Sequence, residues 1–203
     1  LSEHDYYTID SYCHEIGLEW TASVWDLPSL DRLAQFEPPF VKIPSAKLTD
    51  DALLNAAARS GSPVMLSTGM STWDEVDHAV DLIEKYPGAS LLHCHSSYPA
   101  EDRELCLSLI PRLKNRYGLP VGYSSHSVSP FPAIMAIAVG AQAVEFHVTL
   151  NRAAPGTDQA ASQELAGETL ICREAKRFGE IWGDGEKRVW LSEEPSRKKL
   201  RGK

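Results

Sequence analysis

Two histidines of this 203-residue chain, His126 and His147, each stand just past an apolar run and could do metal chemistry together. The runs, residues 121–125 and 143–146, are typical of buried parallel strands, whose ends carry the active sites of α/β folds. Two neutral imidazoles that converge there can bind a divalent metal ion. Taken singly, each histidine could instead be a hydrogen-bonded residue at a strand end.

Other polar side chains also follow apolar runs. They are Ser23 and Asp26, Lys42 and Ser45, Ser67 and Thr68, His95 and Ser96, Ser124 and His126, and Glu145 and His147. Such groups can bind an anion, hold a metal or transfer a proton, provided that the fold brings them to one place.

Six short apolar segments flanked by glycine or proline are predicted as the strands that position these groups. They are residues 18–24, 40–43, 63–67, 90–94, 119–124 and 142–148. Helical patterns alternate with them. Thr49 or Asp50 begins one helix, Ser71 caps the next with Asp74 three residues on, and the leucines at 105, 109 and 113 mark a third.

Strict alternation of strands and helices predicts a parallel sheet, either doubly wound or closed into a barrel. A doubly wound sheet concentrates its site at one switch point, whereas a barrel brings all its strand ends to one mouth. Polar groups at six strand ends favour the barrel. Six units cannot close an eight-stranded barrel, so two more are expected before Leu1.

Composition and charge exclude several classes of protein. The net charge is −8, and basic residues gather only at residues 197–201, which argues against nucleic-acid binding. Four cysteines without a Cys-x-x-Cys spacing argue against a structural zinc site and for reduced thiols. Neither a membrane-spanning stretch nor a signal peptide is visible, so a cytoplasmic protein is expected.

Ordered motifs in the chain resemble those of the N-acetylneuraminate (sialic acid) synthase family. The motifs are Lys42-Ile43-Pro44-Ser45, Leu66-Ser67-Thr68-Gly69-Met70, Leu92-His93-Cys94-His95-Ser96-Ser97-Tyr98-Pro99, Val121-Gly122-Tyr123-Ser124-Ser125-His126, Glu145-Phe146-His147-Val148-Thr149-Leu150 and Pro155-Gly156-Thr157-Asp158. Any one of them alone would be a weak signal, whereas six in order are a strong one.

The resemblance implies a (β/α)8 TIM barrel with six βα units visible in this chain. Residues 1–203 would form a single, partial barrel domain, without the small antifreeze-like domain that usually follows in the family. The implied reaction condenses phosphoenolpyruvate with an N-acyl amino sugar such as N-acetylmannosamine, forming a nonulosonic acid and releasing phosphate. A homodimer is also expected, with no nucleic-acid or membrane partner.

The resemblance also implies roles for individual residues. His126 and His147 match the protein ligands of Mn²⁺ or Mg²⁺, with water and substrate completing the shell, and Lys42 matches the lysine that grips phosphoenolpyruvate. Serines match contacts to its phosphate and carboxylate, and further residues match the pocket wall and the sugar side. They are Ser45, Ser67, Ser96 and Ser124 for the anion, Ser23 and Trp25 for the wall, and Tyr98 and Asp158 for the sugar.

Several positions depart from the family pattern. Lys47 stands where the family has a glutamate that orients the sugar and is a candidate base, which reverses the charge. Ser125, Phe146 and Gln159 replace an aspartate, a basic residue and a histidine. The metal and phosphate positions are thus largely kept while the sugar-facing ones have changed, which suggests a different acceptor or weakened chemistry.

Two other functions fit the same residues. A metal-dependent aldolase or lyase on the same barrel would use pyruvate and would release no phosphate. A non-catalytic barrel that binds a sugar is supported by Lys47. His93 and His95 share a face of their strand, where a second metal site or a hydrogen-bonded histidine would fit.

Overall fold

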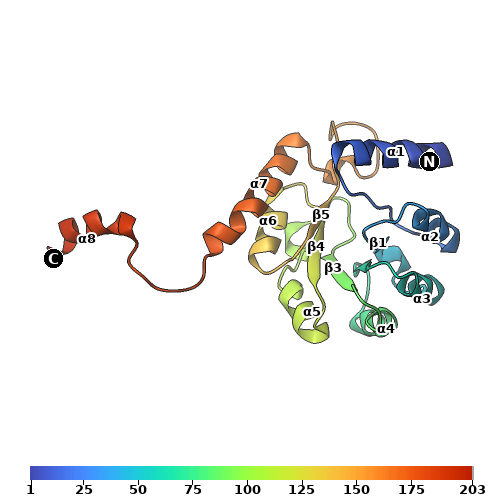
Figure 1. The fold of residues 1–203 in the computed structure, drawn as a ribbon, viewed down its shortest axis with the longest axis horizontal. Helices are drawn as coiled ribbons and strands as arrows, with labels where there is room; N and C mark the ends of the chain where they lie inside the picture. Colours follow the sequence, from blue (N-terminus) through green and yellow to red (C-terminus); the bar gives the residue numbers. More distant parts are fainter. Residues whose placement is uncertain (203) are drawn as a thin grey trace.

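The computed structural model describes residues 1–202, and a curved sheet of five parallel strands lies at its centre (Figure 1). The strands follow each other in chain order across the sheet, from β1 to β5. Their bounds are β1 Val41–Ile43, β2 Val64–Ser67, β3 Ser90–Cys94, β4 Val121–Ser125 and β5 Val144–Phe146. The sheet has the form of a half-barrel.

Helices alternate with the strands, as predicted, and most of them cover the outer side of the sheet, whereas the last helix lies away from it (Figure 1). Their bounds are α1 Glu3–Ile16, α2 Leu27–Ala34, α3 Asp51–Arg59, α4 Trp73–Ile83, α5 Leu109–Tyr117, α6 Phe131–Ala138, α7 Leu165–Trp182 and α8 Glu194–Arg201. None of the helices in residues 1–202 is long and apolar enough to cross a membrane.

Strand alternation separates an apolar face from a polar one. Every second residue of a strand points to the helices, and four of these residues are completely buried in the core. They are Ile43, Leu66, Leu91 and Tyr123. The residues between them point to the concave face of the sheet, where Lys42 and the polar residues described below lie. The core therefore sits between sheet and helices, and the concave face is left for chemistry.

The first predicted strand, residues 18–24, forms only a single parallel bridge, from Ser23 to Lys42. Val24 N–H donates to the Lys42 carbonyl at 3.0 Å. The Thr21 hydroxyl, rather than a backbone amide, donates to the Phe40 carbonyl at 2.7 Å. Because a side chain replaces the next ladder bond, the segment does not extend as a strand, and the six regular strands of the prediction become five.

Two predicted helix starts also move. The N-cap of α4 is Thr72, not Ser71, and Glu75 completes its capping box. Helix α5 begins at Leu109 rather than near Leu105, because a 3-10 turn, Asp102–Glu104, and a left-handed Cys106 precede it. Past α7 the chain leaves the half-barrel as an extended arm that ends in α8 (Figure 1).

Candidate active site

A cavity of about 400 Å³ lies at the carboxyl ends of the strands. Eleven of the twelve predicted site residues line it. They are Ser23, Trp25, Lys42, Ser45, Ser67, Ser96, Tyr98, Ser124, His126, His147 and Asp158. The parallel sheet explains this convergence, because the carboxyl ends of all its strands meet at one edge.

An ion pair between a buried lysine and a partly exposed glutamate lies in the cavity. Lys42 is 6% exposed, and its Nζ lies 3.3 Å from Oε2 of Glu145. The other carboxylate oxygen of Glu145 accepts a hydrogen bond from Ser124 Oγ at 2.8 Å, across the register that pairs β4 with β5. Glu145 thus supplies the counter-charge that a buried ammonium group needs. The predicted site residues did not include Glu145, although it lies two positions before His147 and therefore on the same strand face.

Hydroxyl groups surround a glycine beside this pair. Ser45 Oγ accepts the Gly69 N–H at 3.0 Å and lies 3.1 Å from Cys94 Sγ. A Cβ atom on Gly69 would collide with Ser96 Oγ, so a glycine at this position lets the surrounding side chains approach its backbone closely. Ser67 Oγ is buried and has no hydrogen-bond partner among the described residues. A buried hydroxyl without a partner is costly, and a bound oxyanion would satisfy it.

The two histidines predicted as metal ligands lie with ring centroids 5.3 Å apart. His126 Nδ1 donates to the His95 carbonyl at 2.6 Å, which leaves Nε2 free as an acceptor. Burial lowers the pKa of His126, and the nearby His147 and Lys42 lower it further. His126 is therefore neutral at pH 7, the form that binds metals. His147 Nδ1 lies 3.6 Å from Asp158 Oδ2.

The donor set restricts which ion would fit. No group of three or more His, Cys, Asp or Glu residues within residues 1–202 could hold a metal ion. The protein would therefore contribute only two imidazoles, with water and substrate as the remaining ligands. This fits an octahedral ion such as Mn²⁺ or Mg²⁺ better than a closed tetrahedral zinc site.

Lys47, the twelfth predicted residue, is not among the residues that line the cavity. It ends the 3-10 turn Ser45–Lys47, in which successive side chains point in different directions, so that Ser45 faces the cavity and Lys47 does not. Its Nζ lies 3.2 Å from Oδ2 of Asp50, the N-cap residue of α3.

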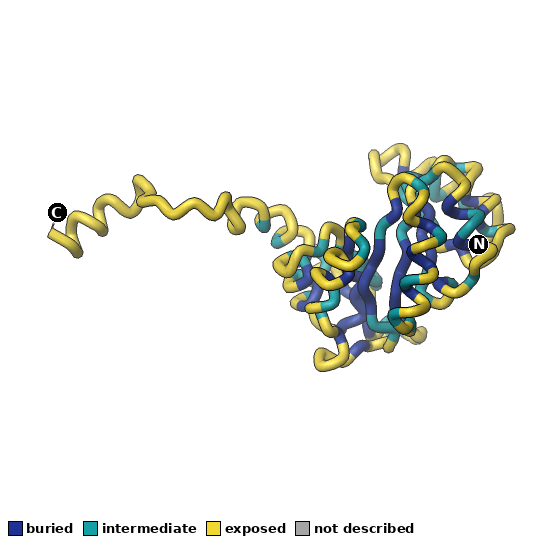
Figure 2. Tube along the Cα trace, turned by 90° about the horizontal axis from the view of Figure 1, so that it is seen from below, coloured by how far each residue is buried: buried dark blue, intermediate teal, exposed yellow. Residues whose placement is uncertain are grey.

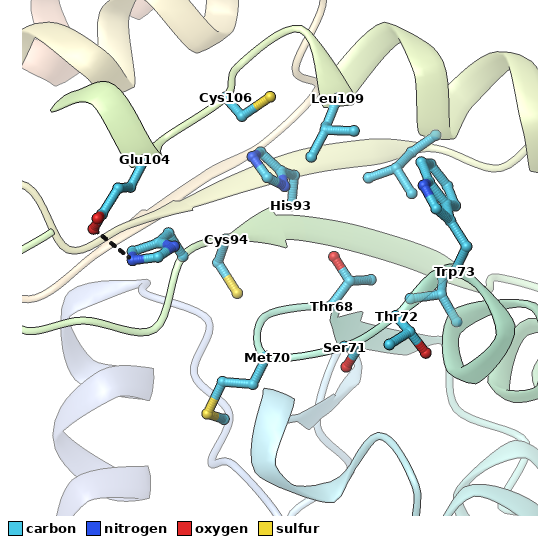
Figure 3. Close-up of a pocket in the computed structure, with 13 residues that line it drawn as sticks. Thr68, Met70, Ser71, Thr72, Trp73, His93, Cys94, Glu104, Cys106 and Leu109 are labelled. Atoms are coloured by element: carbon cyan, nitrogen blue, oxygen red, sulfur yellow. Dashed lines mark ion pairs between the residues drawn. The ribbon is translucent and has the colours of Figure 1, made fainter. Parts of the chain in front are cut away.

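A second cavity, of about 480 Å³, contains His93 and His95, as their shared strand face predicts (Figure 3). His93 Nε2 donates to the Leu105 carbonyl at 2.7 Å, and burial lowers its pKa. His95 Nε2 lies 3.3 Å from Glu104 Oε2. His93 is therefore a hydrogen-bonded histidine of the packed interior. Cys94 lines both cavities.

Comparison with known proteins gives consistent matches. The model of the NeuB family matches residues 1–187. An N,N'-diacetyllegionaminic acid synthase of Legionella pneumophila is 32% identical over 207 residues, covering 99% of this chain and 58% of that protein. An uncharacterized protein of Methanocaldococcus jannaschii is 35% identical over 189 residues, covering 92% of this chain and 56% of that protein.

A solved structure matches the whole half-barrel. The N-acetylneuraminic acid (sialic acid) synthetase of Leptospira borgpetersenii, in complex with citrate, superposes with a TM-score of 0.88 at 32% identity. The superposition covers 100% of this chain and 73% of that one. The chain spans a little over half the length of the curated relatives named above.

Proposed function

The chain belongs to the NeuB family, and we propose that it condenses phosphoenolpyruvate with an N-acyl amino sugar resembling N-acetylmannosamine. The products are a nonulosonic acid and phosphate. Relatives that are named as synthases of N,N'-diacetyllegionaminic acid and N-acetylneuraminic acid support the proposal. The observation that carries it is one cavity that combines a buried lysine, hydroxyl groups around a glycine and two converging imidazoles.

Phosphoenolpyruvate would bind on the side of Lys42. Its anionic groups match the ammonium group of Lys42, which is buried and forms an ion pair with Glu145. Ser67 Oγ, which is buried and unpartnered, would donate a hydrogen bond to one of its oxygens. Gly69 lets the hydroxyls of Ser45 and Ser96 lie close together beside its backbone, where both could donate to the anion.

Glu145 is one of two carboxylates that line the cavity, with Asp158 the other, and we assign it the role of proton acceptor. It is held by Lys42 and Ser124, and its side chain is 42% exposed, so water can reach it. In the reaction, C3 of phosphoenolpyruvate forms a bond to the aldehyde carbon, and water adds at C2. Glu145 would take one proton of that water and pass it to the aldehyde oxygen, which becomes a hydroxyl group. The bond from C2 to the phosphate oxygen then breaks, phosphate leaves with the bonding electron pair, and loss of the second proton of the added water makes C2 a ketone.

His126 and His147 would hold Mn²⁺ or Mg²⁺. When bound there, the ion supplies Lewis-acid polarisation of the aldehyde oxygen. We also propose that the five-stranded half-barrel is part of a (β/α)8 barrel.

The test measures phosphate release from phosphoenolpyruvate in the presence of Mn²⁺ and N-acetylmannosamine or related N-acyl amino sugars. We expect Lys42→Met to lower kcat/KM by about 100-fold and Ser67→Ala to raise the KM for phosphoenolpyruvate by about 10-fold. Asp81→Asn, on the exposed side of α4, is the matched control and should leave both values unchanged.

Failure to release phosphate with any acceptor would overturn the synthase proposal. Turnover with pyruvate in place of phosphoenolpyruvate would instead show a metal-dependent aldolase.

A further inference from the structure

Tyr98 packs against both histidines of the candidate metal site. Its ring centroid lies 4.0 Å from that of His126, with the planes tilted by 31°. It lies 5.6 Å from the ring of His147, which it meets edge to face at 84°. One aromatic ring therefore restricts both imidazoles, at distances at which aromatic pairs attract each other.

The loop that carries Tyr98 is attached to the same strand end. Ala100 N–H donates to the carbonyl of His126 at 2.9 Å. The ring of Tyr98 is thus tied to the backbone of the histidine on which it packs. The arrangement does not depend on a substrate, because both contacts lie within the protein.

Asp158 bridges His147 to its own loop. Its Oδ2 lies 3.6 Å from His147 Nδ1, and its Oδ1 accepts a hydrogen bond from Thr157 Oγ1 at 2.8 Å. Its carbonyl accepts the Ser162 hydroxyl at 2.8 Å and the Ala161 N–H at 3.1 Å, which fix the turn after it. The carboxylate is thus held by its own loop on the Nδ1 side of the His147 ring, where it can support the imidazole while the Nε2 edge of the ring stays available.

We infer that Tyr98 and Asp158 are positioning residues that hold His126 and His147 in the orientation a divalent ion requires. The inference rests on the proposed metal site and adds two side chains that would support its ligands. His126 is fixed by the His95 carbonyl and by the Tyr98 ring, and His147 by the Asp158 carboxylate and the edge of the same ring. In this role Tyr98 and Asp158 hold the metal-binding histidines in place, which is separate from any contact that they make with the sugar.

The experiment measures the Kd of Mn²⁺ for the full chain by electron paramagnetic resonance of the free ion, in the absence of either substrate. Asp158→Ala is expected to weaken Mn²⁺ binding by roughly 10- to 100-fold, the usual effect of losing such a supporting carboxylate. Tyr98→Ala should weaken it as well, whereas Tyr98→Phe, which keeps the ring, should bind like the unmodified protein. Asp81→Ala is the matched control for loss of an exposed carboxylate.

Melting temperatures without metal separate positioning from unfolding, because a positioning role leaves them unchanged. A Kd for Asp158→Ala within about twofold of the unmodified protein, together with a raised KM for the sugar, would overturn the inference and leave Asp158 as a sugar contact only. Equal weakening by Tyr98→Phe and Tyr98→Ala would overturn the role of the ring. Mn²⁺ binding that is absent, or that persists in His126→Ala, would instead overturn the proposed metal site, and this inference with it.

Discussion

At the scale of single residues, Gly69 determines where the side chains that would bind the anion can lie. A Cβ atom there would collide with Ser96 Oγ and come within 2.9 Å of Cys94 Sγ and Ser45 Oγ. We therefore expect Gly69→Ala to raise the KM for phosphoenolpyruvate by at least about 10-fold and to cost roughly 1–3 kcal/mol of stability through overpacking. Steady-state kinetics and thermal melting measure the two effects.

The matched control for this substitution is Gly179→Ala in α7, where a Cβ atom meets nothing within 4 Å. Because alanine is the better helix former, this variant should gain up to about 1 kcal/mol. An unchanged KM in Gly69→Ala would show that the anion does not occupy the space beside the glycine.

His93 should make stability depend on pH. Burial lowers its pKa in the folded protein, so the unfolded chain binds more protons below the ordinary histidine value of about 6.5. The free energy of unfolding should therefore fall as the pH drops from 7.5 to 5.5. His93→Gln keeps a donor for the Leu105 carbonyl but cannot titrate, and should show a smaller fall in urea titrations at the two pH values. Equal falls in both proteins would assign the pH dependence to other groups.

Residue types and their spacing were enough to select eleven residues that line one cavity, because a parallel sheet brings the ends of its strands together. Two differences between the prediction and the cavity lining are local. Glu145 was left out although strand alternation places it beside His147, and Lys47 was included although a 3-10 turn directs it elsewhere. Sequence motifs do not show the backbone rotation of a single turn, and that rotation separates Ser45 from Lys47.

At the scale of elements, Lys47 lies at the start of α3, where it forms an ion pair with the N-cap residue Asp50. Asp50 Oδ1 accepts the Leu53 N–H at 3.1 Å and Oδ2 accepts from Lys47, and these bonds hold the pKa of Asp50 below its usual range. Lys47→Glu should cost up to about 1 kcal/mol, through like charges at the N-cap, and should leave kcat/KM unchanged. Melting and phosphate-release assays measure this, with Lys47→Met as the uncharged control. A gain in turnover would show that residue 47 reaches the sugar.

The boundaries of a helix or strand were predictable where a single sequence pattern marked them. The third strand of the sheet matches its predicted range, residues 90–94, because the apolar run is continuous. The start of α4 was wrong by one residue, since Ser71 with Asp74 and Thr72 with Glu75 both have capping-box spacing. The structure decides for Thr72 because the Ser71 hydroxyl donates to the Gly69 carbonyl instead.

At the scale of the whole molecule, stability lies in the half-barrel and not in the arm beyond it. Every described residue from 183 to 202 is exposed, including the large apolar side chains of Trp190 and Leu191, whereas Ile171 in α7 is 1% exposed (Figure 2). Removal of the chain after Trp182 should therefore leave the melting temperature unchanged, because nothing buried is lost. Ile171→Ala, by contrast, should cost about 2–5 kcal/mol.

The dependence of the melting temperature on protein concentration tests whether the arm packs on a second copy of the chain. A protein that melts as a single folded chain has a melting temperature that does not depend on concentration, whereas one stabilised by association does. If truncation lowers the melting temperature, and more so at high protein concentration, the arm packs on a second copy of the chain. That outcome would contradict the prediction that truncation leaves the melting temperature unchanged, and it would support the homodimer expected from the sequence.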